Sequence, residues 1–307
     1  MKTVFLFSGQ GSQYPGMGKE LAELYPEAAA EIFGTAEKVL GFDLKEKMLS
    51  GTAEELAVTT VSQPAILAAS LLALHAAKDK GLTYTAVAGH SLGEYAAMAA
   101  SGMLTTEEAF TAIKYRSEAM DKAAKANPGG MAAVINLDSA KIAEICEKVS
   151  AEGEYVTPVN YNSPVQTVIA GTKAAIEKAS SLLMEAGARR VIPLSVAAAF
   201  HSKFMSGAAE EFCTAAKNIP FKTPNVDFFA NVTGAKLNDF SDMPQYLAKH
   251  ICSPVRFVEE LNALKAEGYD TYVECGPGKV LTGLVKKTLT DVKAVNIEDK
   301  ASLEAAL

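Results

Sequence analysis

The chain has 307 residues, of which 49% are hydrophobic and 21% are charged, and it carries a formal net charge of −7. This length suits one large domain with an inserted smaller one, or two domains, and the composition is that of an ordinary globular protein. A negative chain without a basic run argues against nucleic acid as a general partner.

The spacing of the cysteines indicates a reducing compartment, and hydropathy argues against a signal peptide and a membrane span. The four cysteines lie far apart without a C-x-x-C pair, which argues against a disulfide framework or a zinc knuckle. The N-terminal apolar run, Val4 to Phe7, is shorter than the ~7–15 residues of a signal-peptide core. The most apolar later region, 61–77, is interrupted by Ser, Gln, Pro and His, so we expect a buried helix and no membrane span. We therefore expect a cytoplasmic protein.

The first 126 residues alternate predicted strands with predicted helices. An apolar run over 3–9 ends in glycine, which indicates a buried strand and a tight turn. The other segments are helices over 16–40 and 62–80, a strand over 84–90, and helices over 92–102 and 105–126. Strands that alternate with long helices predict a parallel sheet with helices on its faces.

A different order begins after 127-NPGG-130. The next segments are strand, helix, strand, strand, helix and strand, over 131–137, 139–150, 155–161, 166–171, 173–186 and 189–196. This is the ferredoxin-like order. Strands and helices alternate again over 226–232, 243–252, 255–266, 271–275 and 280–289. We predict an α/β fold, with a large domain over 1–127 and 198–307 and a small ferredoxin-like domain inserted over 128–197.

Ser91 stands in a G-x-S-x-G pattern, Gly89-His90-Ser91-Leu92-Gly93, between a predicted strand and a predicted helix. A serine on such a sharp turn has strained backbone angles and needs small neighbours. The unpaired N–H groups at the start of the helix can stabilise an oxyanion. The pattern favours a nucleophilic serine over the alternative, a glycine-flanked serine that only caps a helix.

The base for this serine must be one of four histidines. His90 adjoins Ser91 and is expected to point away from the hydroxyl, and His75 is expected to lie in the core of a buried helix. His201 follows a predicted strand, where functional residues of parallel sheets concentrate, and this position favours it over His250 near a helix end. No acid stands at a large-domain strand end between Ser91 and His201. We therefore expect a dyad whose histidine is oriented by another group, such as a main-chain carbonyl.

Arg116 lies on the apolar stripe of the helix 109-AFTAIKYRSEAMDKAA-124. A buried guanidinium without a partner reduces the free energy of unfolding by roughly several kcal/mol, because its charge is uncompensated. Two interpretations remain open, an internal ion pair and an arginine that awaits an anionic substrate, since its planar fork binds a carboxylate bidentately.

Two glycine-rich loops fail as nucleotide-binding motifs. The segment 8-SGQGSQYPGMG-18 lacks the third glycine of G-x-G-x-x-G, and in 275-CGPGKVLTG-283 the lysine is followed by valine. No H-E-x-x-H and no acidic cluster at ligand spacing is present in the sequence. We therefore predict no metal and no dinucleotide or other cofactor.

Eight motifs in order resemble one family over nearly the whole chain, the malonyl-CoA:acyl carrier protein transacylases of bacterial type II fatty-acid synthesis. The motifs are FSGQGSQYPGMG, TVSQPAI, GHSLGEYAA, KYRSEAM, NYNSPVQTVIAG, FHSKFM, SPVRF and ECGPGKVLTGL. The resemblance implies a hydrolase-like core with a ferredoxin-like insert. It also implies that Ser91 is the nucleophile, that His201 is its base and that Arg116 binds the malonyl carboxylate.

The resemblance assigns three further positions through their backbones. The N–H groups of Gln10 and Leu92 would form the oxyanion hole, and the main-chain carbonyl of His250 would hold His201. Many members have glutamine at the position of His250. The triplet Phe200-His201-Ser202 resembles the malonyl-selective members, whereas the run 197–199 is smaller than in many relatives.

The implied activity is a ping-pong transfer of malonyl from malonyl-CoA to the phosphopantetheine thiol of acyl carrier protein, through a malonyl-serine. The alternatives are a serine hydrolase or thioesterase, an acyltransferase of a polyketide pathway, and a non-catalytic docking module. The carrier proteins of this pathway are acidic, so docking on this negative chain requires a basic patch. Its candidates are Lys286–Lys287, Lys279 and Arg189–Arg190. We expect a monomer that contacts no membrane.

Overall fold

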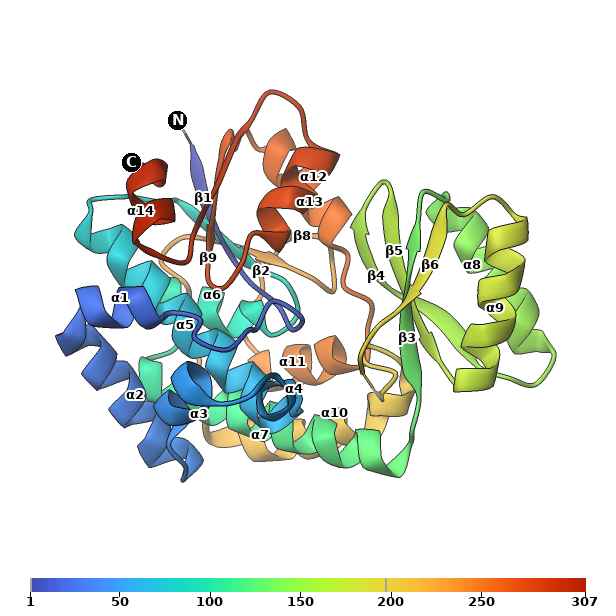
Figure 1. The fold of residues 1–307 in the computed structure, drawn as a ribbon, viewed down its shortest axis with the longest axis horizontal. Helices are drawn as coiled ribbons and strands as arrows, with labels where there is room; N and C mark the ends of the chain where they lie inside the picture. The colour runs from blue at the N-terminus through green and yellow to red at the C-terminus, as the bar shows by residue number, and fades with distance from the viewer. Residues whose placement is uncertain (1, 197) are drawn as a thin grey trace.

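The structure is a computed structural model that describes residues 2–196 and 198–307. It has a larger body around a six-stranded sheet and a smaller body around a four-stranded sheet (Figure 1). The larger sheet has the order β10-β9-β1-β2-β7-β8. Its strands are β1 (Thr3–Phe7), β2 (Ala86–Gly89), β7 (Asp227–Ala230), β8 (Ala235–Lys236), β9 (Thr271–Cys275) and β10 (Lys293–Ile297). All neighbouring pairs are parallel except β7 and β8, which confirms the predicted parallel sheet.

Helices cover the larger sheet. They are α1 (Lys19–Leu24), α2 (Pro26–Leu40), α3 (Leu44–Ser50), α4 (Ala53–Ala57), α5 (Thr59–Asp79), α6 (Gly93–Ala100), α7 (Thr106–Ala126), α10 (Ser206–Ala215), α11 (Met243–Ile251), α12 (Phe257–Ala266), α13 (Val280–Thr288) and α14 (Lys300–Ala306). Helix α5 is long and apolar enough to cross a membrane, but 83% of its apolar window is buried in the protein. An all-round apolar helix buried in this way is a core helix.

The smaller sheet has the order β4-β5-β3-β6, and all its pairs are antiparallel. Its elements are β3 (Gly130–Ile135), α8 (Ser139–Ala151), β4 (Val156–Ser163), β5 (Gln166–Gly171), α9 (Lys173–Glu185) and β6 (Arg190–Pro193). This order and pairing confirm the predicted ferredoxin-like unit. Helices α8 and α9 lie on the outer face of the sheet, away from the larger body (Figure 1).

Alternation along β3 explains how the smaller sheet is held. Ala132 and Val134 pack with α8 and α9, whereas Met131 and Ala133 belong to the core of the larger body. Successive side chains of a strand point to opposite faces, so one strand serves both cores. The backbone also joins the two bodies, because Val255 donates to the Val159 carbonyl at 2.8 Å.

Several predicted bounds were wrong for local reasons. The helix expected over 16–40 is interrupted at Tyr25, because Pro26 begins α2 and disfavours a helical residue before it. The strand expected over 189–196 is only β6, Arg190–Pro193. The short elements α3, α4, β8, β10 and α14 were not predicted. The domain boundaries at 127/128 and 197/198 stay a prediction, and Ala197 lies outside the described residues.

Candidate active site

Ser91 occupies the turn between β2 and α6 in a left-handed backbone conformation, with φ of 55°. A Cβ atom on Gly89 would lie 2.1 Å from the carbonyl carbon of Gly93, and a Cβ on Gly93 would lie 2.1 Å from the Phe7 carbonyl oxygen. Only glycine fits at either position, which is the steric reason for the G-x-S-x-G spacing. The chain thus presents the Ser91 hydroxyl at the carboxyl end of the parallel sheet.

His201 meets Ser91 from a turn 110 residues later, where its own φ is 58°. Its Nε2 lies 2.7 Å from Ser91 Oγ. Its Nδ1 lies 3.1 Å from the main-chain carbonyl oxygens of both His250 and Ser253. A carbonyl oxygen only accepts, so Nδ1 carries the proton and Nε2 is free to accept one from the serine.

The other histidines are placed differently. His90 Nε2 lies 2.8 Å from Asn162 Oδ1, away from the Ser91 hydroxyl. His75 was expected in the helix core, and this expectation was wrong. The residue is exposed on α5, and its ring meets that of Tyr25 edge-on at 5.1 Å.

Burial and a neighbouring cation keep His201 neutral. Burial lowers the pKa of His201 to about 3, and the Arg116 guanidinium adds to the shift. An imidazole with this pKa is uncharged throughout the physiological range, as a base for a serine must be.

Arg116 on α7 is 1% exposed and reaches the same hydroxyl. Its Nη1 donates to Gln63 Oε1 at 2.8 Å and its Nη2 donates to Ser91 Oγ at 2.9 Å. It forms no ion pair within 4.0 Å with any residue that the structure describes, and its Nε has no partner there. The internal ion pair, one of the two interpretations of this arginine, is therefore not what the geometry shows. The guanidinium remains available to an anion beside Ser91.

The backbone N–H groups of Gln10 and Leu92 are also available. Gln10 follows β1 in the loop that lines the cavity over Ser91, and Leu92 caps the start of α6. Among residues 2–196 and 198–307, neither N–H donates to a protein acceptor. Unpaired donors next to a nucleophile can bind a developing oxyanion.

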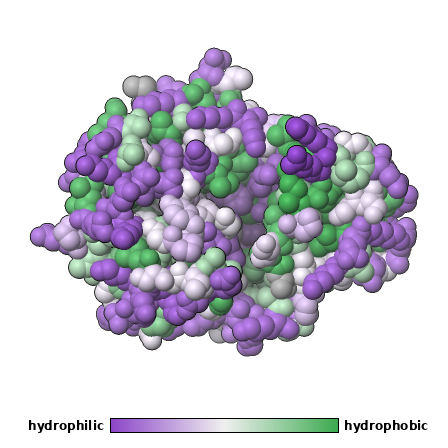
Figure 2. All heavy atoms as spheres, viewed as in Figure 1, coloured by the Kyte–Doolittle hydropathy of each residue, from purple (hydrophilic) through white to green (hydrophobic). Residues whose placement is uncertain are grey.

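A cavity of about 410 Å³ opens over the dyad and includes Ser91, His201, Gln10 and Phe200 in its lining. A smaller cavity of about 200 Å³ adjoins it and shares Gln10 and His90. The surface is hollowed between the two bodies, with hydrophobic residues on the smaller body beside the hollow (Figure 2). A concave lining that combines apolar side chains with a few polar groups is typical of a small-molecule site.

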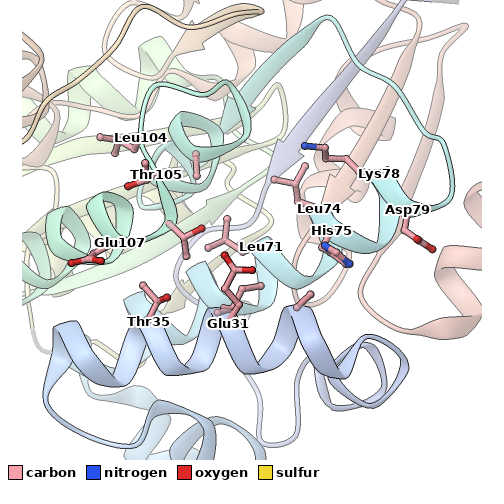
Figure 3. A pocket seen from close by; sticks show the side chains of 14 residues that line it. Glu31, Thr35, Leu71, Leu74, His75, Lys78, Asp79, Leu104, Thr105 and Glu107 are labelled. Atoms are coloured by element: carbon pink, nitrogen blue, oxygen red, sulfur yellow. The ribbon is translucent and has the colours of Figure 1, made fainter.

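A larger hollow than the one over Ser91 lies elsewhere. It measures about 950 Å³ and runs between α2, α5 and the start of α7, with Glu31, His75, Lys78 and Asp79 on its sides (Figure 3). None of its lining residues belongs to the group around Ser91. Size alone therefore does not identify the reactive site.

Three residues of the site were missed by sequence reasoning. Gln63 holds the Arg116 guanidinium, the Ser253 carbonyl shares His201 Nδ1, and Asn231 accepts the Ser91 N–H at 2.7 Å. A signal existed for two of them. Gln63 is a polar residue in the apolar helix α5, and Asn231 directly follows β7 at the carboxyl end of the sheet.

Comparisons with known proteins identify the family of the chain. Residues 4–303 match the family model described as acyl transferase domain. The malonyl CoA-acyl carrier protein transacylase of Bacillus subtilis (strain 168) is 42% identical over 306 residues, which cover 100% of this chain and 96% of that protein. The protein of the same description from Escherichia coli (strain K12) is 38% identical, with 99% and 98% covered.

Two solved structures are similar over the full length. The acyl-carrier-protein S-malonyltransferase of Burkholderia pseudomallei 1710b has a TM-score of 0.95 and 37% identity, with 100% of this chain and 99% of that chain covered. A malonyl-transacylase in complex with its type II polyketide acyl carrier protein has a TM-score of 0.95 and 36% identity, with 100% and 99% covered.

Proposed function

The chain belongs to the acyl transferase domain family, and from this premise we propose that it is a malonyl-CoA:acyl carrier protein transacylase of fatty-acid synthesis. Full-length relatives at 36–42% identity that carry this description support the assignment. The reaction is the transfer of a malonyl group from the thiol of CoA to the phosphopantetheine thiol of the carrier protein.

The observation that carries the substrate class is the buried guanidinium of Arg116, which lies 2.9 Å from the nucleophile and has no ion-pair partner among the described residues. A malonyl ester on Ser91 Oγ has its carboxylate two bonds beyond the acyl carbon, within reach of that guanidinium. A carboxylate there supplies the missing counter-ion, whereas an acetyl group leaves the buried charge unpaired.

In the first half-reaction His201 Nε2 takes the proton from Ser91 Oγ, which attacks the thioester carbonyl of malonyl-CoA. The N–H groups of Gln10 and Leu92 bind the oxyanion of the tetrahedral intermediate. The intermediate collapses to the malonyl-serine ester, and His201 returns its proton to the departing CoA thiolate. The carbonyl oxygens of His250 and Ser253 hold the imidazole in the required tautomer.

In the second half-reaction the thiol of the carrier protein's phosphopantetheine takes the place of CoA. His201 accepts its proton, the thiolate attacks the ester, and Ser91 leaves with the proton from His201. The malonyl group moves from one thiol to a serine ester and then to a second thiol, so the transfer needs no further reactant. We accordingly propose that neither step uses a metal or an organic cofactor.

The carrier protein needs a basic surface near the cavity. Lys279 and the pair Lys286–Lys287 are exposed on and before α13, and Val280 lines the smaller cavity that adjoins the active site. These residues are the candidates for docking, together with Arg189–Arg190. We propose that the enzyme acts as a monomer in the cytoplasm and contacts no membrane or nucleic acid.

A carrier protein of a polyketide pathway is a second candidate acceptor, because one similar structure is a malonyl-transacylase bound to such a protein. Titration of both carrier proteins against a fixed malonyl-CoA concentration ranks the two by kcat/KM.

The function is tested by incubating the enzyme with labelled malonyl-CoA, with and without pantetheinylated carrier protein. We expect a malonyl adduct on Ser91 by mass spectrometry and a malonyl-carrier product. Rapid release of free malonate without that product would instead identify a hydrolase, and the absence of any adduct would identify a non-catalytic module.

A further inference from the structure

A closed ring of hydrogen bonds joins Ser91 to His201 through two side chains that the mechanism above does not use. Ser91 Oγ lies 2.7 Å from His201 Nε2, and His201 Nδ1 donates to the His250 carbonyl at 3.1 Å. The imidazole of His250 returns through Nε2, which lies 3.1 Å from Asn231 Oδ1. The ring closes where the Ser91 N–H donates to the same Oδ1 at 2.7 Å.

The chemistry of its partners determines the orientation of the Asn231 amide. Its Nδ2 lies 2.6 Å from the Gly89 carbonyl oxygen, which only accepts, and 2.8 Å from Glu260 Oε2. The nitrogen therefore faces these oxygens, and Oδ1 faces the Ser91 N–H. Since Oδ1 only accepts, the Nε2 atom of His250 carries a proton.

Asn231 brackets the strained turn of the nucleophile. It binds the carbonyl of Gly89 before the turn and the N–H of Ser91 within it. A non-glycine residue at φ 55° persists only when the surrounding structure holds it there. These two bonds are such a constraint, and they act on the backbone of the reacting residue.

Hydrogen bonds to other buried groups hold Asn231 in place. Its main-chain N–H donates to Glu94 Oε1 at 2.6 Å, and the Tyr246 hydroxyl lies 2.9 and 3.0 Å from the two oxygens of that carboxyl. The side chains of Asn231, Glu94, Glu260 and His250 are fully buried. Among the described residues, His250 Nδ1 and Glu260 Oε1 have no hydrogen-bond partner, so the constraint on Asn231 comes from its own hydrogen bonds.

The network carries little net charge near neutral pH. Burial raises the pKa of Glu94 to about 8 and raises that of Glu260 well above its usual range. Burial also holds the pKa of His250 well below its usual range. The 3.7 Å between His250 Nδ1 and Glu94 Oε2 is therefore a contact of neutral groups and no ion pair. With these three groups neutral, the network adds no charge of its own to that of Arg116 beside His201.

We propose that Asn231 is a positioning residue for Ser91. The side chain of His250 links Asn231 to the segment 250–253, whose main-chain carbonyls bind His201. The nucleophile and the base then keep one geometry through both half-reactions. This inference rests on Ser91 as the nucleophile of the proposed function.

The side chain of His250 is tested with a matched pair of variants, His250→Gln and His250→Met. The two side chains have similar length and both keep the main-chain carbonyl for His201, but only glutamine has an N–H for Asn231. The first readout is the second-order rate at which a small fluorophosphonate modifies Ser91, because it needs neither CoA nor carrier protein. The second is kcat and KM for malonyl transfer.

We expect the methionine variant to be modified about tenfold more slowly than the glutamine variant, with a similar loss in kcat, as for one lost hydrogen bond in a positioned pair. The KM for malonyl-CoA should differ by less than about threefold between the two, since the cavity and Arg116 are unchanged. Equal modification rates in the two variants would overturn the role of the His250 side chain.

Asn231→Ala tests the other half of the ring. We expect about a 100-fold loss in modification rate and in kcat, the scale of a small misplacement of a reacting group. Ser101→Ala is the matched control, because the buried Ser101 hydroxyl donates to the Met98 carbonyl at 3.1 Å outside the ring. A rate like that of the control would overturn the proposal. Should Asn231→Ala not fold, the His250 pair alone decides.

The two proposals fail in distinguishable ways. A wild-type enzyme whose Ser91 takes up neither malonyl nor fluorophosphonate contradicts the proposed function. A wild-type enzyme that reacts at Ser91 while all ring variants react equally fast contradicts only the role of the ring.

Discussion

The Nη2 atom of Arg116 lies 2.9 Å from the Oγ atom of Ser91, and the guanidinium forms no ion pair with any residue in the described part of the chain. A fully buried cation beside a nucleophile destabilises the protein unless a bound anion compensates it. We therefore expect the pair to couple substrate charge to the reacting atom, since an acyl group with a terminal carboxylate brings its own counter-ion.

Arg116→Ala should reduce malonyl transfer much more than acetyl transfer. Loss of one partner of a buried, hydrogen-bonded charge pair costs about 3 kcal/mol, which is about 100-fold in kcat/KM. The measurement is kcat/KM for malonyl-CoA and for acetyl-CoA in the wild type and the variant. Arg116→Lys is the control, because it keeps the charge and loses the bidentate fork. Equal losses for both substrates would remove the carboxylate assignment.

Gln63→Glu should weaken malonyl transfer without touching the dyad. Gln63 Oε1 accepts from Arg116 Nη1 at 2.8 Å, so a glutamate there places a carboxylate on the same guanidinium. That internal counter-ion competes with the substrate, and we expect kcat/KM for malonyl-CoA to fall about 10- to 100-fold. Fluorophosphonate modification of Ser91 serves as the control and should stay within about threefold. An unchanged malonyl kcat/KM would show that Arg116 does not bind the carboxylate.

Features that depend on local pattern were predictable from the sequence. The strand, the glycines and the helix around Ser91 are adjacent in the chain. The five residues 89–93 therefore contain the small neighbours that the turn requires. Arg116 was conspicuous because a charge interrupts an apolar helix face. The order of elements in the smaller body could also be predicted, since the hydrophobic periods of strands and helices differ.

Features that depend on distant contacts were not predictable in the same way. Position favoured the ring of His201 over that of His250 as the base, whereas the contact of the His250 carbonyl with His201 was implied only by the family resemblance. Asn231 follows a strand end, which marks it as a candidate, but the backbone N–H that it binds is 140 residues away and its contact with Ser91 cannot be read from the sequence. Short strands such as β8 and β10 form because a neighbouring strand is already present, and their own residues show little periodicity.

The reactivity of Ser91 should persist to unusually low pH. The base must be unprotonated, and burial together with Arg116 lowers the pKa of His201 to about 3. We expect the rate of fluorophosphonate modification to fall less than about threefold between pH 8 and pH 5, whereas a histidine with an ordinary pKa near 6.5 would lose about 30-fold. Circular dichroism at each pH confirms that the protein remains folded.

A matched variant tests the cause of that shift. Arg116→Ala removes the neighbouring cation, so the pKa of His201 should rise and the midpoint of the pH–rate curve should move upward with it. A wild-type rate that halves near pH 6.5 would contradict the assigned environment of His201.

Glu94→Gln should change how the free energy of unfolding depends on pH. Burial raises the pKa of Glu94 to about 8 in the folded protein, above the ordinary value of 4.5. Between these two values the folded state holds a proton that the unfolded state releases, so the wild type loses stability as the pH rises. Glutamine has the same shape and does not titrate. The stability of the wild type relative to Glu94→Gln should therefore fall by roughly 2–4 kcal/mol between pH 5 and pH 9, given about 1.4 kcal/mol per pKa unit. Urea denaturation of both proteins at the two pH values measures this difference, in which the other titrating groups cancel. A difference that stays constant with pH would show that Glu94 is ionised in the folded protein, and that the network beneath Ser91 carries a negative charge.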